Sequence, residues 1–349
     1  AWSVSNKHLR KHILAPITTH LFGRAGHAMN NLSIKLTTAG GGTPFMRQAP
    51  HGIAKWDGCE FFIHKDIDVC DLWVVYGGIG KQESTRARHT LFVTNEPPSV
   101  KRYSARFLRQ FDTVITCKQH VHHPHVIYTQ QALPWLVGHN FADDTKNSKT
   151  YDELRSIQDI PKTKLLSVIT SNKTFTKGHR DRIAFVQHLQ KEFGDQIDVF
   201  GIDQVVDDKW DAIAPYKYHI VIENASIDDY WTEKLSDAFL GLAFPIYYGA
   251  PNISKYFSSD SFVQIDIGTL DDAIAIIKHI ITSDAYEQHL DALHTAKDQI
   301  LDTYQLFPML AAYARSIEST DHHIVTLAPE RESSIVRYIK RIYHYVKGH

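Results

Sequence analysis

The sequence lacks most of the features that mark secreted, membrane-spanning or nucleic-acid-binding proteins. Its 349 residues include only Cys59, Cys70 and Cys117, too few and too scattered for a disulfide framework or a zinc motif. The formal net charge is −1, so no overall field favours nucleic acid. No apolar run reaches the ~20 residues of a membrane helix, and the first residues lack the apolar stretch of a signal peptide. We expect a soluble cytoplasmic protein in a reducing compartment, unless an anchor is missing from the sequence.

Apolar strands alternate with amphipathic helices along most of the chain. Runs that suit buried strands occupy residues 12–17, 59–64, 71–78, 89–96, 112–117, 125–130, 164–170, 198–201, 219–224, 244–249 and 262–266. Helical patterns cover residues 29–38, 100–110, 151–157, 181–193, 230–242 and 271–282, and a further helical stretch continues to about residue 318. Alternation of this kind predicts an α/β fold with parallel sheets.

A polar, charged segment at residues 142–164 predicts a linker between two domains. We therefore expect a Rossmann-like domain at residues 1–150 that binds an acceptor. A second Rossmann-like domain at residues 151–325 is expected to bind a donor. Ligands of such open sheets bind beyond the carboxyl ends of the strands, which is where the polar side chains gather in this sequence.

The last segment, residues 326–349, predicts an amphipathic helix. Ile335, Ile339, Ile342 and Val346 fall on one face of it. We expect this helix to pack on the protein body. The alternative is a surface helix that makes a peripheral contact with anionic lipid.

Side chains suited to a nucleotide sugar gather in residues 216–257, YKYHIVIENASIDDYWTEKLSDAFLGLAFPIYYGAPNISKYF. Asn224 follows a predicted strand, and Tyr230, Glu233 and Lys234 open the predicted helix after it. At positions i, i+3 and i+4 these three share a helical face. They supply a phenol, a carboxylate and an ammonium, which suit the ribose hydroxyls and the phosphates. An ordinary charged helix start would contain similar residues, because a glutamate there suits the helix dipole.

This segment resembles the donor-binding motif of the α1,3-fucosyltransferases of glycosyltransferase family 10. That motif runs approximately YKF-x-L-x-FEN-x(5,6)-YVTEK, then a helix, then P-V/I-x-x-G. The chain departs from it at Ile222, where the family has Phe, and at Trp231, where the family has Val. The larger Trp231 is expected to reshape the pocket near the base or the sugar. The resemblance implies a GT-B fold, with two domains around a central cleft, and GDP-fucose as the co-substrate of the residues named above.

A second resemblance lies upstream. Residues 165–189, LLSVITSNKTFTKGHRDRIAFVQHL, resemble the family's VVSN…R…L stretch, in which a strand runs into a helix. Arg182 has the matching spacing, seven residues before Leu189, and in the family that arginine contacts the diphosphate. Lys177 and Arg180 are close enough to compete for the role. Cations are unfavourable at a helix start unless an anionic ligand offsets the cost.

Glu96 is the candidate base. It directly follows a predicted strand in the element TNE, which resembles the family's TGE, whose glutamate is the proposed general base. An inverting transfer needs a carboxylate to take the proton from the attacking hydroxyl, and cations to receive the leaving diphosphate. We expect Glu96 to meet the first need and Arg182 and Lys234 the second. The other carboxylates in this half, such as Asp71 and Glu60, have no supporting resemblance.

Two stretches that suggest a metal site are better explained otherwise. The histidines of residues 120–125, HVHHPH, are closely spaced, and Pro124 disfavours the helix that would arrange them as ligands. Asp228 and Asp229 are adjacent rather than spaced, and we expect them to cap the helix that begins at Tyr230. We therefore expect no obligatory metal and no cofactor besides the GDP-fucose co-substrate. A divalent ion that stimulates activity remains an alternative.

The sequence therefore predicts an inverting glycosyltransferase that moves L-fucose from GDP-fucose to a hydroxyl of an oligosaccharide or glycolipid acceptor, in glycan biosynthesis or protein glycosylation. One alternative keeps this fold and chemistry with another GDP-deoxysugar or a GDP-heptose as donor. The other is a non-catalytic module that binds a sugar or a nucleotide. We expect no nucleic-acid partner, and a cytoplasmic location that includes the inner membrane face if the terminal helix contacts lipid.

Overall fold

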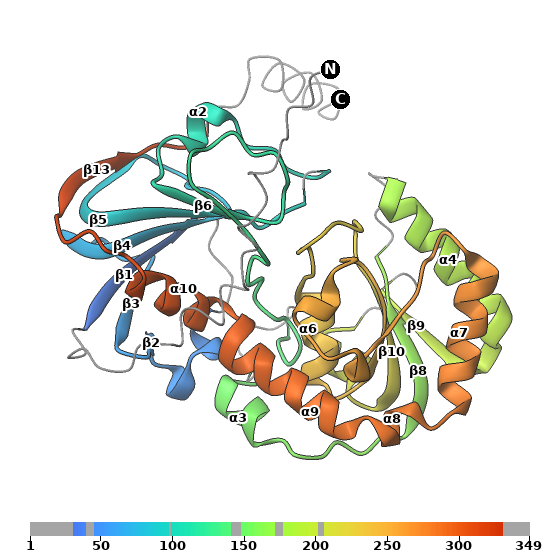
Figure 1. The fold of residues 1–349 in the computed structure, drawn as a ribbon. Helices are drawn as coiled ribbons and strands as arrows, with labels where there is room; N and C mark the ends of the chain where they lie inside the picture. Colours follow the sequence, from blue (N-terminus) through green and yellow to red (C-terminus); the bar gives the residue numbers. More distant parts are fainter. Residues whose placement is uncertain are drawn as a thin grey trace, which may run out of the picture.

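The computed structural model describes residues 31–39, 45–97, 99–140, 148–171, 177–201 and 206–330. Within these ranges the chain forms two bodies, each built on a parallel sheet, that lie side by side (Figure 1). No helix in the described ranges is long and apolar enough to cross a membrane. The strand predicted at residues 12–17 and most of the predicted terminal helix lie outside the described residues.

The first sheet comes mainly from the N-terminal half of the chain. Its order is β2-β3-β1-β4-β5-β6-β7, and β13 pairs with β5 outside that order. The strands are β1 (Leu32–Thr38), β2 (Lys55–Trp56), β3 (Cys59–Ile63), β4 (Val69–Tyr76), β5 (Glu83–Val93), β6 (Thr113–Thr116), β7 (Val126–Tyr128) and β13 (His323–Leu327). All neighbours pair in parallel except β2 and β13, which are antiparallel to their partners. β4 is buried along most of its length, as expected for a strand covered on both faces.

The second sheet has five parallel strands in the order β12-β11-β10-β8-β9. They are β8 (Lys164–Ile169), β9 (Ile197–Phe200), β10 (Tyr216–Ile222), β11 (Phe244–Tyr248) and β12 (Val263–Gln264). Numbered from β8, the order reads 2-1-3-4-5, which is a doubly wound arrangement. The order reverses between β8 and β10, so this topology predicts a ligand site beyond the carboxyl ends of those two strands.

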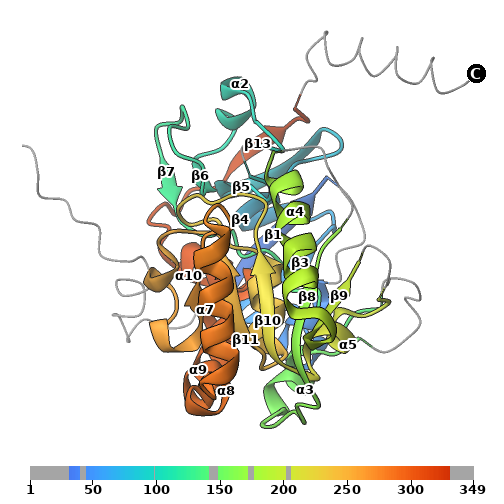
Figure 2. The same ribbon diagram turned by 90° about the vertical axis from the view of Figure 1, so that its right-hand side faces the viewer.

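The α-helices of the two bodies are α2 (Ala105–Leu108), α3 (Tyr151–Ser156), α4 (Lys177–Phe193), α5 (Lys209–Ile213), α6 (Glu233–Leu240), α7 (Leu270–Thr282), α8 (Ala285–Gln288), α9 (Leu290–Gln299) and α10 (Leu306–Arg315). Helices cover both faces of the second sheet. Figure 1 shows α6 on the side of the sheet that faces the first body. Figure 2 shows α4 and α7 in front of the sheet, on its outer side. Two parallel α/β bodies confirm the predicted pair of Rossmann-like units.

The chain crosses between the two bodies twice, which corrects the predicted domain limits. Trp135 and Val137 already belong to the hydrophobic core of the second body. Farther along, α10 packs on the core of the first body, and β13 joins the first sheet. The second body therefore begins before residue 151 and ends before residue 325. The linker predicted at residues 142–164 is also wrong in its described part, because Leu154 and Ile160 are buried in the second core.

Two predicted helices also differ from the structure. Most of residues 29–38 form β1, where Ile34 and Leu36 are fully buried. The strand tolerates Lys35 inside the sheet because its ammonium lies 3.0 Å from the carboxylate of Glu83. The helix predicted at residues 100–110 is reduced to α2, whose first turn is capped by the hydroxyl of Ser104.

Candidate functional site

A cavity of about 470 Å³ lies at the carboxyl ends of β8 and β10. Glu96 and Val100, which follow β5, contribute the wall from the first body, and most of the lining belongs to the second body. The cavity therefore occupies the point at which the strand order reverses. A ligand bound there would contact both bodies.

Arg182 connects the ends of the two central strands of the second sheet. It is 4% exposed. Its Nη1 donates a hydrogen bond of 2.8 Å to Asn224 Oδ1, and its Nη2 donates one of 3.0 Å to Ser171 Oγ. Its Nε has no partner in the described part of the chain. Burial lowers the pKa of Arg182, and the nearby charge of Glu223 opposes this change. A buried guanidinium with a spare N–H beside a cavity is suited to an anionic ligand.

Glu223 anchors the start of α6. It is 1% exposed and accepts hydrogen bonds of 2.8 Å from both the backbone N–H and the hydroxyl of Thr232. The hydroxyl of Thr232 in turn caps α6 by accepting the N–H of Lys234. Burial raises the pKa of Glu223, although Lys234, whose ammonium lies 3.2 Å away, opposes the shift. These contacts fix the first turn of α6 at the cavity.

Glu233 lies between two lysines at the cavity wall. Its Oε1 is 3.4 Å from Lys234 Nζ and 3.9 Å from Lys209 Nζ. Burial alone would raise the pKa of Glu233, but the two lysines hold it at about 2. Burial opposes the charge of Lys234, but Glu223 and Glu233 outweigh it and raise the pKa of Lys234. The site therefore holds an ionised carboxylate beside ionised ammonium groups.

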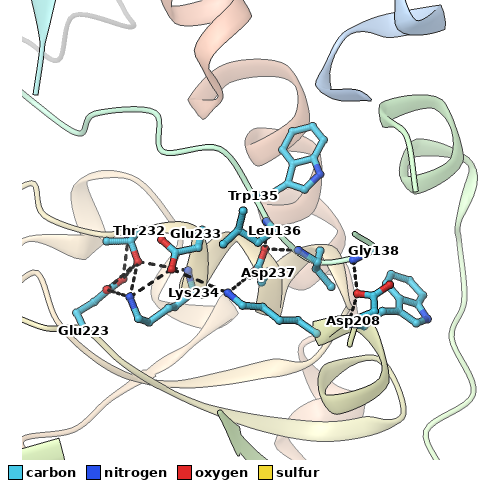
Figure 3. Close-up of polar contacts among 12 residues, drawn as sticks. Trp135, Leu136, Gly138, Asp208, Glu223, Thr232, Glu233, Lys234 and Asp237 are labelled. Carbon is cyan, nitrogen blue, oxygen red and sulfur yellow. Dashed lines mark hydrogen bonds and ion pairs between the residues drawn. The ribbon is translucent and has the colours of Figure 1, made fainter. Parts of the chain in front are cut away.

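Asp237 connects this charged cluster to the segment through which the chain enters the second body. Its side chain is fully buried, and its Oδ2 lies 2.8 Å from Lys209 Nζ. Its Oδ1 accepts the N–H groups of Leu136 and Val137 at 2.8 and 2.9 Å. The polar contacts run from Glu223 through Lys234, Glu233 and Lys209 to Asp237 and Leu136, and Figure 3 labels all of these residues except Lys209.

The structure brings most of the predicted site residues together. Glu96, Arg182, Asn224, Glu233 and Lys234 all line the cavity. Lys177 and Arg180 are exposed on the first turn of α4 and are not among the lining residues. Lys177 forms an ion pair with Asp181 at 2.6 Å. Of the three cations predicted for the diphosphate role, Arg182 is the one that lines the cavity.

Tyr230 does not open α6, so the predicted helix at residues 230–242 starts too early. The residue is 2% exposed and precedes the helix cap, Thr232. Asp229 is not the cap either, because its backbone is left-handed, with φ 62°. Its Oδ1 instead accepts hydrogen bonds of 3.0 Å from Asn252 and 2.8 Å from Lys255. The shared helical face predicted for Tyr230, Glu233 and Lys234 is therefore wrong. Burial, followed by the charges of Glu223, Glu233 and Glu96, raises the pKa of the Tyr230 phenol.

Trp231 packs away from the cavity. It is 3% exposed, and its ring makes edge contacts with Tyr256, Phe257 and Tyr304, with centroids 5.2 to 5.8 Å apart. The expectation that Trp231 reshapes the pocket is therefore corrected. Trp231 belongs to an aromatic cluster close to Tyr304, just before the chain returns to the first body. This cluster explains why a large residue fits at position 231.

Several cavity residues were not predicted from the sequence. They are Thr170, Lys209, His219 and Asp237. Thr170, which directly follows β8, carried a signal in its position after a strand. Lys209 and Asp237 carried no such signal, because they pair with each other across two helices, α5 and α6, and the sequence does not show that contact. His219 is buried within β10, where burial lowers its pKa to about 3.

Within the described ranges, no three histidine, cysteine, aspartate or glutamate side chains are arranged to hold a metal ion. In the histidine-rich loop, the ring nitrogens of His123 lie 2.9 Å from the carbonyl oxygens of His125 and Phe111. His123 therefore fixes the conformation of that loop.

Comparisons with known proteins give a match over the second body. The model for Glycosyltransferase family 10 (fucosyltransferase) C-term matches residues 160–295. The Alpha-(1,3)-fucosyltransferase FucT of Helicobacter pylori is 36% identical over 98 residues, which is 28% of this chain and 18% of that protein. A fucosyltransferase-like protein of Arabidopsis thaliana is 34% identical over 74 residues, 21% of this chain and 14% of that one. The chain thus matches less than a fifth of the length of either relative.

Solved structures also align with the chain. The crystal structure of an alpha1,3-fucosyltransferase with GDP-fucose has a TM-score of 0.46 and 18% identity, covering 81% of this chain and 94% of that one. The corresponding crystal structure with GDP has a TM-score of 0.47, with the same identity and coverage.

Proposed function

We propose that this protein, whose residues 160–295 match the model for Glycosyltransferase family 10 (fucosyltransferase) C-term, transfers L-fucose from GDP-fucose to a hydroxyl of an acceptor glycan. One observation supports the proposal best. Glu96 from the first body lines the same cavity as Arg182 and Lys234 from the second. A base for the acceptor and cations for the leaving nucleotide thereby share one space.

The second body supplies the groups that a nucleoside diphosphate requires. Arg182 and Lys234 provide two cations for the phosphates, and the N-terminal amides of α6 add to them. The ionised carboxylate of Glu233 suits the ribose diol, because it accepts hydrogen bonds from both hydroxyls. The cavity of about 470 Å³ falls within the ~300–1,000 Å³ of ordinary ligand pockets.

In the proposed reaction, Glu96 takes the proton from the acceptor hydroxyl as the acceptor oxygen forms a bond to the anomeric carbon of fucose. The bond from that carbon to the β-phosphate oxygen breaks, and GDP leaves with the bonding pair. Attack from the face opposite to GDP inverts the anomeric centre. Arg182 and Lys234 offset the charge that develops on the β-phosphate. We further propose that no divalent ion is obligatory, which predicts undiminished transfer in the presence of EDTA.

A panel of donors tests the proposal. Wild-type protein is incubated with GDP-fucose, another GDP-deoxysugar or a GDP-heptose, with and without glycan acceptors, and both GDP release and glycosylated product are measured. Product from GDP-fucose supports the proposal. Product from another GDP-sugar alone would mean that the proposed donor is wrong but the proposed reaction is right. Binding of GDP without product from any donor would identify a non-catalytic nucleotide-binding module.

A further inference from the structure

Lys209 occupies a position in the cavity wall between two carboxylates. Its Nζ lies 2.8 Å from Asp237 Oδ2 and 3.9 Å from Glu233 Oε1. The Lys209 side chain is 20% exposed, whereas that of Asp237 is fully buried. Lys209 begins α5 and reaches both carboxylates on α6. It therefore comes from outside the segment 216–257, which contains α6.

The neighbouring Lys234 is shared between two carboxylates. Glu223 lies 3.2 Å and Glu233 3.4 Å from its ammonium group. A diphosphate that binds Lys234 must compete with both of them for the same three N–H donors. A second cation close to the same Glu233 Oε1 weakens this competition, because it shares the charge of that carboxylate. Among the described lysines, Lys209 is the one whose ion pairs place it there.

We propose that Lys209 is a positioning residue of the nucleotide site. It keeps the Glu233 carboxylate ionised and directed toward the ribose of the donor, and it leaves Lys234 available for the diphosphate. Lys209 acts through Glu233 and need not touch the ligand itself. The inference rests on the proposed function, because it takes a nucleoside diphosphate as the occupant of the cavity.

Lys209 also stabilises the fold, and a test must separate the two roles. The Asp237 carboxylate is fully buried and holds the N–H groups of Leu136 and Val137 as well as Lys209. Removing Lys209 alone leaves this charge without its cation and destabilises the protein. In the double variant Lys209→Met with Asp237→Asn, both charges disappear together. The asparagine Oδ1 can still accept the same two backbone hydrogen bonds.

The experiment measures the Kd of GDP by titration calorimetry, and the Tm, for wild type, the double variant and Lys209→Gln. In Lys209→Gln the amide can still donate to Asp237, but the buried carboxylate loses its cation, so the Tm of this variant measures the structural share of the role of Lys209. Lys278→Gln is the matched control, because Lys278 on α7 forms an exposed ion pair with Glu192 on α4 and is not a cavity residue. GDP is the probe, so the acceptor need not be known.

We expect the double variant and Lys209→Gln, which both lack the charge of Lys209, to bind GDP at least about tenfold more weakly than wild type when they are folded. This difference corresponds to ~1.4 kcal/mol. The control should bind like wild type. As the pH is lowered, the variants without Lys209 should lose GDP affinity at a higher pH than wild type, because the pKa of Glu233 rises without Lys209. A folded variant without Lys209 that keeps both the wild-type Kd and the wild-type pH dependence of GDP binding would overturn the inference. A wild-type protein that does not bind GDP would contradict the proposed function instead.

Discussion

The guanidinium of Arg182 donates a hydrogen bond of 2.8 Å to the side-chain oxygen of Asn224. This contact joins the helix that follows β8 to the end of β10, across the point where the strand order of the second sheet reverses. Because Ser171 holds the same guanidinium at 3.0 Å, the cation is in place before any ligand arrives. A preorganised cation saves the ordering cost that a mobile side chain would incur on binding.

Arg182→Lys is expected to weaken GDP binding about tenfold or more, because a lysine keeps the charge but cannot bridge Asn224 and Ser171 as a planar guanidinium does. Titration calorimetry with GDP measures the effect. Lys177→Gln is the comparison on the same helix, since Lys177 is exposed and paired with Asp181. A large loss in Lys177→Gln with none in Arg182→Lys would reverse the assignment of the diphosphate cation.

Glu96→Gln is expected to lower the rate of transfer about 100-fold or more while leaving GDP-fucose affinity within a factor of about three. The amide keeps the size of the side chain but cannot accept the proton of the acceptor hydroxyl. Single-turnover transfer and equilibrium binding separate the two quantities. Transfer at the wild-type rate would show that another group is the base.

Four of the cavity residues could be predicted because they lie in two short segments that each carry a recognisable spacing. Arg182, Asn224, Glu233 and Lys234 were chosen on that basis, and all four line the cavity. The exact start of α6 was not predictable. Asp229 is as good a cap as Thr232 by residue type, and the tertiary bond between Thr232 and the buried Glu223 decides between them. Lys209 was missed because its partners are on another helix.

The outline of the fold followed from strand–helix alternation, but the return of the chain to the first body did not. Helical periodicity shows that α10 has an apolar face, yet it does not specify which sheet that face covers. The structure shows that α10 packs on the first core and that β13 pairs with β5. β1 was misread for a related reason, since Lys35 finds a buried partner only once β5 is in place.

Tyr76→Phe is expected to raise the free energy of unfolding by ~1 kcal/mol. Tyr76 ends β4 at 6% exposure, and its hydroxyl has no hydrogen-bond partner within the described residues. Removing the hydroxyl therefore removes an uncompensated desolvation cost. Tyr103→Phe is the matched control, because the Tyr103 hydroxyl donates to the carbonyl of Gly77 at 3.0 Å, and its loss should destabilise the protein by a similar amount. Urea unfolding of both variants checks the opposite signs, and a destabilised Tyr76→Phe would refute this explanation.

His219 is expected to make the protein less stable as the pH falls below about 6.5. Burial lowers the pKa of His219 to about 3, and the charges of Lys209 and Lys162 add to the shift. In the unfolded chain the imidazole has its ordinary pKa of 6.5. The unfolded state therefore binds more protons between these values, so acidification favours unfolding.

The His219→Asn variant should lack this contribution. The slope of its unfolding free energy against pH, measured by urea titration between about pH 6.5 and pH 5, should be smaller than that of wild type by up to ~1.4 kcal/mol per pH unit. Comparing slopes removes the pH-independent cost of the substitution itself. Identical slopes would mean that His219 binds a proton equally well in the folded protein.

A glycan-array assay with labelled GDP-fucose tests directly whether this protein transfers fucose at the cavity between its two bodies. Wild-type protein is predicted to label at least one class of acceptor glycan, with the anomeric configuration opposite to that of the donor. Glu96→Gln is predicted to leave the array unlabelled while still binding GDP-fucose. A folded wild-type protein that labels no acceptor, or product that retains the donor configuration, would contradict the proposed function.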